Sequence, residues 1–212
     1  MEAGVFQRLI EPNDSSLRYL QKYIVEQNAD FAIGLDCDAD RVEIVLREGN
    51  LVSGNDILAI IIEEILSEIK NPEEKTIVVN DATSYLVKEI AEKYKANWQE
   101  VEVGEINVVD KMLELSSPIA GEGSNGGVII PPTRCRDGIL TILFLLKVLE
   151  NKKTTLKELI KKLPKYHYVE NRKPHDLSCG RSKCYSFRFL SILKTRACDK
   201  PTPLGVGGLL FF

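Results

Sequence analysis

The chain has 212 residues, 44% of them hydrophobic and 28% charged, a composition typical of a soluble globular protein. Its formal net charge of −3 gives no reason to expect nucleic acid as a partner, and no stretch is apolar over the length of a membrane span. The five cysteines have no paired spacing, so we expect a reduced, cytoplasmic protein.

The first fifty residues predict a helix followed by two strands. The helix is expected to turn Leu17, Leu20, Ile24 and Tyr23 toward one apolar face. The apolar run Phe31–Leu35 predicts a buried strand, and Val42–Leu46 predicts a second one after a short acidic loop. Residues 1–50 are therefore expected to form part of an α/β domain.

Strands and helices alternate between residues 54 and 164. Helices are predicted at 54–71, 82–94, 106–115, 136–149 and 154–163, and strands at 76–79, 98–103, 118–120 and 128–130. Alternation over about one domain's length predicts a layered α/β/α domain on a mostly parallel, mixed sheet.

The C-terminal part differs in composition from the rest. Residues 1–173 contain 22 Lys and Arg against 29 Asp and Glu, whereas residues 174–212 contain 6 against 2 and three of the five cysteines. The tail also has no clear periodicity. We therefore expect residues 165–212 to be an atypical tail, and a truncated gene or changed reading frame after residue 173 would explain it.

Three aspartates, Asp36, Asp38 and Asp40, alternate with small residues directly after the first predicted strand, and Arg41 follows them. Carboxylates this close repel one another unless a cation lies between them, and oxygen ligands favour Mg²⁺ or Mn²⁺. Arg41 suggests that a phosphate is held beside the metal. Cys37 is expected to fill space under the loop.

Three other interpretations of this loop compete with a Mg²⁺ or Mn²⁺ site. An EF-hand fails because Arg41 and Arg47 stand where it needs Gly and a bidentate Glu. A phosphatase with Asp36 as nucleophile is compatible with the local sequence, although no downstream Lys and acidic pair stands out. A solvated acidic turn is disfavoured, since three alternating carboxylates directly follow a buried strand.

A glycine-rich loop at 121–127 is a second candidate site. Its functional interpretation is close backbone approach to a ligand, with Glu122, Ser124 and Asn125 bonding to sugar hydroxyls. A mobile connection without function is about equally compatible with this composition.

Four segments in consistent order resemble the α-D-phosphohexomutase superfamily, the phosphomannomutase and phosphoglucomutase enzymes. Residues 36–41 resemble its metal loop (Asp-Gly-Asp-Gly/Ala-Asp-Arg), and residues 103–108 resemble its Val-Gly segment. Residues 121–127 resemble its sugar-recognition loop, and residues 136–138 match the helix start that follows. The resemblance implies that residues 1–50 are the second half of domain 2 and residues 54–164 are domain 3.

The resemblance also implies Mg²⁺ bound by Asp36, Asp38 and Asp40, a phosphate contact from Arg41, and a hexose phosphate held by Glu122 and Ser124 or Asn125. Such enzymes interconvert hexose 1- and 6-phosphates through a phosphoserine. This chain has no Thr-Ala-Ser-His-Asn-Pro phosphoserine loop and no Arg-x-Ser-Gly-Thr-Glu-Pro motif. We therefore expect an incomplete, inactive enzyme or a non-catalytic module that binds Mg²⁺ and sugar phosphate, self-associating through exposed apolar surface.

Overall fold

The computed structural model describes residues 12–123, 127–171 and 191–196. Residues 1–163 form one compact unit and residues 164–212 a second one, and each is described by itself. Within the described residues, no helix combines the length and hydropathy needed to cross a membrane.

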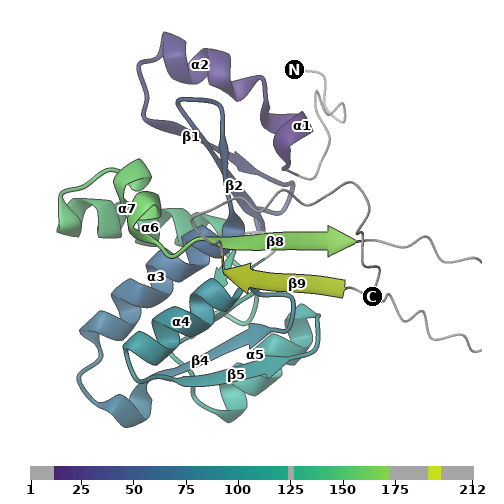
Figure 1. The fold of residues 1–212 in the computed structure, drawn as a ribbon, viewed down its shortest axis with the longest axis vertical. Coiled ribbons are helices and arrows are strands. Elements are labelled where there is room, and N and C mark those ends of the chain that lie inside the picture. The colour runs from purple at the N-terminus through teal and green to yellow at the C-terminus, as the bar shows by residue number, and fades with distance from the viewer. Residues whose placement is uncertain (1–11, 124–126, 172–190, 197–212) are drawn as a thin grey trace, which may run out of the picture. The chain divides into compact units, whose positions relative to one another are not determined.

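The N-terminal part of the first unit is a small antiparallel sheet with short helices (Figure 1). Its elements are α1 (Asp14–Leu17), α2 (Leu20–Glu26), β1 (Phe31–Leu35), β2 (Val42–Leu46) and β3 (Leu51–Val52). The two predicted strands pair as a hairpin in which Leu35 lies opposite Val42, so the six residues between them form its loop.

The helix face predicted for this part is only partly right. Leu17 and Ile24 are buried and pack with Val45, but Tyr23 is 53% exposed. The cause is the position of Tyr23 on α2, about 100° around the helix from Ile24. The predicted single helix is also divided in two: α1 ends at Leu17 and α2 begins at Leu20.

The larger part of the first unit contains the alternating elements. They are α3 (Gly54–Glu68), η1 (Pro72–Glu74), β4 (Thr76–Asn80), α4 (Tyr85–Lys93), β5 (Asn97–Val101), α5 (Glu105–Glu114), β6 (Ile119–Gly121), β7 (Val128–Ile129), α6 (Gly138–Lys152) and α7 (Leu156–Lys162). The sheet order is β5-β4-β6-β7, with β4 parallel to β5 and β6 and with β7 antiparallel to β6. The predicted α/β fold on a mostly parallel, mixed sheet is confirmed.

Helices cover both faces of this sheet, which explains why every residue of β4 is buried. Val78 and Ala120 pack against Val108 and Met112 of α5 on one face. On the other face, a Cβ added at Gly121 would lie 2.7 Å from Leu58 of α3. Alternate residues of β6 thus face opposite helical layers, as the pleat requires.

The second unit contains one antiparallel pair, β8 (Tyr166–Asn171) and β9 (Ser191–Arg196), with Tyr166 opposite Arg196. The strand β9 lies in the tail, where the sequence has no clear periodicity, so sequence patterning missed it. The assignment of residues 1–50, 54–164 and 165–212 to particular family domains stays a prediction.

Candidate functional site

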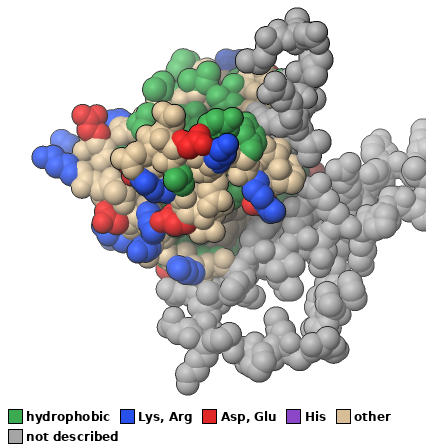
Figure 2. Space-filling view, turned by 90° about the horizontal axis from the view of Figure 1, so that it is seen from above, with side chains coloured by type: hydrophobic (Ala, Val, Ile, Leu, Met, Phe, Trp, Pro, Cys, Tyr) green, Lys and Arg blue, Asp and Glu red, His purple; other side chains and the backbone are tan. Residues whose placement is uncertain are grey.

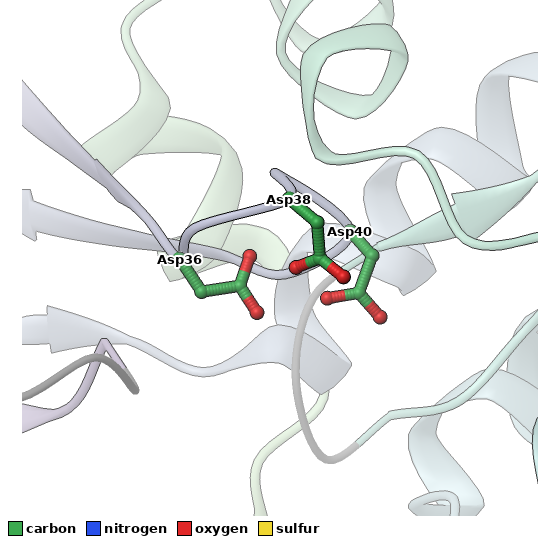
Figure 3. Close-up of side chains that lie close together, drawn as sticks. All are labelled: Asp36, Asp38 and Asp40. Carbon is green, nitrogen blue, oxygen red and sulfur yellow. The ribbon is translucent and has the colours of Figure 1, made fainter.

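The three aspartates lie together in the hairpin loop between β1 and β2. Each offers one carboxylate oxygen, and these three oxygens all lie within 4.8 Å of one another. The carboxylates converge on a common space beside the loop (Figure 3). The side chain of Asp36 is 8% exposed and that of Asp40 is 26% exposed, while Asp38 is exposed. The cluster is thus open to solvent on the side of Asp38.

Backbone contacts fix the shape of this loop. The Arg41 amide donates to Asp36 Oδ1 at 3.2 Å, and Ala39 has a left-handed φ of 59° that turns the chain. The amide of Gly138, the first residue of α6, donates to the Ala39 carbonyl at 2.9 Å. A Cβ on Gly138 would lie 2.7 Å from that carbonyl oxygen, so α6 can approach the loop only with glycine there.

The cluster fits a small divalent cation. Octahedral Mg²⁺ with bonds of about 2.1 Å holds its ligand oxygens about 3 to 4.2 Å apart. The aspartate oxygens, all within 4.8 Å of one another, need to close by at most about 2 Å to reach that geometry. Three carboxylates also match the preference of Mg²⁺ and Mn²⁺ for hard oxygen ligands.

Arg41 lies at the edge of the cluster with its side chain 33% exposed. Its Nε is 3.7 Å from Asp36 Oδ2 and 3.9 Å from Asp40 Oδ1. These distances are electrostatic contacts longer than hydrogen bonds. The guanidinium therefore lies where it can meet an anion held beside the aspartates.

The second candidate site is more enclosed than the sequence suggested. Glu122 follows β6 and is 7% exposed. Its Oε1 accepts from Asn80 Nδ2 at 2.8 Å and from the Gly104 amide at 3.3 Å, and its Oε2 accepts from Arg136 Nη1 at 3.1 Å. A sugar hydroxyl would reach this carboxylate only by joining or replacing those donors. Ser124 and Asn125 lie outside the described residues.

Cys37 is exposed, so the expectation that it fills space under the loop is wrong. The reason is its position between Asp36 and Asp38: the 4.8 Å grouping of the carboxylates fixes the loop, and the thiol is left on the outside.

Arg136 joins the two candidate sites, a role that sequence analysis missed. Its Nη2 donates to Asp40 at 2.5 Å, its Nε to Glu105 at 2.8 Å and its Nη1 to Glu122 at 3.1 Å. Burial lowers the pKa of Arg136, but Asp40, Glu122 and Glu105 outweigh it and the pKa is raised. The guanidinium is thus a fixed charge between the aspartate loop and Glu122. Its acidic partners lie up to 96 residues away in sequence, so no local pattern could reveal it.

Comparison with known proteins decides the family. A family model described as "Phosphoglucomutase/phosphomannomutase, alpha/beta/alpha domain III" matches residues 53–166, more than half of the chain. The chain belongs to the α-D-phosphohexomutase superfamily. The glycine loop and Arg136 lie inside the part that the family model matches, whereas the aspartate loop precedes it.

Individual relatives match more of the chain than the family model does. A phosphoglucomutase/phosphomannomutase of Thermococcus kodakarensis is 30% identical over 164 residues, which is 77% of this chain and 35% of that protein. The structure of a Thermus thermophilus protein assigned as a phosphomannomutase has a TM-score of 0.66 at 25% identity, covering 79% of this chain and 41% of that one.

A third neighbour was solved with ligands. The N-acetylphosphoglucosamine mutase of Aspergillus fumigatus, in complex with GlcNAc-6P and magnesium, has a TM-score of 0.52 at 17% identity and covers 72% of this chain and 38% of that one. At this identity the likeness is one of fold. The matched part of this chain corresponds to about a third of the length of the Thermococcus kodakarensis relative.

Proposed function

We propose that this chain provides the metal-binding loop and the sugar-recognition domain of a phosphohexomutase. The observation that carries the proposal is the grouping of three aspartate oxygens within 4.8 Å, followed at once by Arg41, in the same compact unit as the family's domain III. We propose that the chain takes part in the superfamily's activity on hexose phosphates and binds a metal ion for it.

Each group has a distinct role in this proposal. Asp36, Asp38 and Asp40 hold Mg²⁺, which when bound neutralises charge on a phosphoryl group during transfer. Arg41 binds the phosphate beside the metal. Glu122, Ser124 and Asn125 bind the hydroxyls of the hexose, and the neighbour crystallised with GlcNAc-6P and magnesium supports this pairing of ligands.

The serine that accepts and returns the phosphoryl group is proposed to come from outside residues 1–212, since no Thr-Ala-Ser-His-Asn-Pro segment is present in them. The chain alone is therefore expected to bind Mg²⁺ and hexose phosphate without interconverting the 1- and 6-phosphates.

The test is to incubate the pure chain with Mg²⁺ and the 1-phosphates of glucose, mannose and N-acetylglucosamine. The proposal expects hexose phosphate binding that requires Mg²⁺, with neither a 6-phosphate nor free phosphate produced. A 6-phosphate would show that the chain carries its own phosphoryl acceptor. Release of inorganic phosphate that is lost in Asp36→Asn, although that variant still binds Mg²⁺, would instead identify a phosphatase with Asp36 as nucleophile.

The low exposure of Asp36 bears on this alternative. Its side chain is 8% exposed and its Oδ1 accepts the Arg41 amide, so the carboxylate is held by the loop rather than presented to solvent. A nucleophile must reach the phosphorus atom in line with the leaving group. The arrangement therefore favours Asp36 as a metal ligand.

A further inference from the structure

Arg136 makes ion pairs with three carboxylates from three separate segments of the chain. It lies just before α6, and its side chain is 10% exposed. Three nitrogens of one guanidinium point at three carboxylates that come from the β1–β2 loop, from the start of α5 and from the end of β6. Two of these acceptors, Asp40 and Glu122, are the proposed ligands of two different groups, the metal and the sugar.

The hydrogen bonds from Arg136 restrict both carboxylates. Asp40 accepts with Oδ2, which leaves Oδ1 for a cation, and Glu122 accepts with Oε2 while Asn80 and Gly104 hold Oε1. Residues that orient the ligands of a metal in this way typically change its affinity by about 10- to 100-fold when they are mutated.

Glu105 anchors the guanidinium without belonging to either proposed site. Its Oε2 accepts both the Nε and the backbone amide of Arg136, at 2.8 and 3.3 Å. Glu105 thus fixes the plane of the guanidinium, and this planar group joins Asp40 to Glu122 through one hydrogen bond to each. A lysine ammonium has no such plane and cannot hold three separate acceptors in this geometry.

We infer that Arg136 is a positioning residue that couples metal binding at the aspartate loop to sugar-phosphate binding at Glu122. The inference rests on the proposed function, because it takes Asp40 as a metal ligand and Glu122 as a sugar ligand. A cation on Asp40 fixes that carboxylate, the guanidinium follows it, and Glu122 is held in its binding orientation. Coupling of this kind is reciprocal, so the sugar phosphate must tighten Mg²⁺ binding by the same factor.

The experiment measures Mg²⁺ affinity of the full chain by calorimetry, with and without saturating glucose 1-phosphate. We expect the sugar phosphate to tighten Mg²⁺ binding at least threefold in the unaltered chain. In Arg136→Lys, Mg²⁺ affinity should fall about tenfold, the lower end of the range for residues that orient ligands, and the ratio with and without sugar phosphate should fall to one. Arg134→Lys, an exposed arginine two residues away, is the matched control and should change neither value.

The outcomes separate this inference from the proposed function. If the unaltered chain binds no Mg²⁺, or Asp38→Asn binds it equally well, the proposed metal site is wrong. If Asp38→Asn abolishes binding but Arg136→Lys keeps the affinity or the ratio of the unaltered chain, the metal site stands and the coupling role is overturned.

Circular dichroism of each variant checks that it is folded. If Arg136→Lys does not fold, Glu105→Gln replaces it, since Glu105 touches Arg136 but neither proposed ligand. A folded Glu105→Gln should lower both the Mg²⁺ affinity and the ratio a few-fold. Unchanged values in that variant would also overturn the inference.

Discussion

Asn80 lies beneath Glu122, the proposed sugar ligand, and its substitution tests the buried polar network around that carboxylate. Asn80 is 1% exposed, its Nδ2 donates to Glu122 at 2.8 Å, and its Oδ1 accepts from the Thr83 hydroxyl at 2.9 Å. A hydrogen bond to a charged group contributes about 1.5 to 3 kcal/mol and a neutral one about 0.5 to 1.5 kcal/mol. Asn80→Ala should therefore destabilise the chain by about 2 to 4 kcal/mol.

The assay is urea unfolding followed by fluorescence of Trp98, the one tryptophan of the chain. Trp98 lies on β5 opposite Ile77 of β4, so its signal reports on the sheet that carries Asn80. Asn107→Ala is the matched control, because the Asn107 amide is exposed and makes only 3.4 Å contacts with backbone carbonyls. Equal, small losses in both variants would refute the claim that Glu122 is held by a buried network.

Three further predictions address the loop, the acid dependence and the surface. In Gly127→Ala the new Cβ would lie 2.3 Å from the Asp40 carbonyl oxygen and would displace Asp40. The Mg²⁺ affinity measured by calorimetry should therefore fall several-fold, and an unchanged affinity would mean that the loop adapts freely. Burial raises the pKa of Glu64, but hydrogen bonds from Asn151 and Lys152 outweigh this effect, and the pKa is lowered below 4.5. The ionised Glu64 therefore stabilises the fold above pH 4.5, and this stabilisation is lost as the pH falls through the pKa of the folded state. Glu64→Gln should accordingly narrow the difference in unfolding free energy between pH 7 and pH 3, and an unchanged difference would contradict this. Ile139, Leu143 and Leu146 are 45 to 58% exposed along α6, so light scattering should detect self-association that Leu143→Asp reduces, and a monomer at all concentrations would count against it.

Exposed apolar side chains also occur on the short helices of the N-terminal part. Tyr19 and Tyr23 of the α2 region are each about half exposed, with their rings edge-to-face at 6.1 Å. The view from that end shows hydrophobic side chains gathered on the surface (Figure 2). If Leu143→Asp leaves the association unchanged, substitution of Tyr23 would test this second face.

The aspartate loop was predictable because its information is local. Carboxylates at every second position after a strand have few structural uses, and the structure places their oxygens together. The alternating elements of the α/β domain were predictable for the same reason, since helix and strand periodicities extend over several residues.

The burial of Glu122 and the role of Arg136 depend on long-range contacts and could not be predicted in this way. Residues 136–138 looked like the start of a helix, and Asp137 does cap α6. The guanidinium of the neighbouring Arg136, however, forms ion pairs with Asp40, Glu105 and Glu122, which lie on three separate segments. The close approach of Gly127 and Gly138 to the β1–β2 loop brings these groups together.

Direct titration of Mg²⁺ into the chain is the most decisive measurement for the proposed function. We expect one equivalent to bind, and the affinity to fall at least tenfold in Asp38→Asn, whose exposed side chain can change without disturbing the core. Asp30→Asn, an exposed aspartate before the other end of β1, is the control and should bind Mg²⁺ as the unaltered chain does. Absence of binding, or equal binding by all three proteins, would contradict the assignment of the aspartate loop as a metal site.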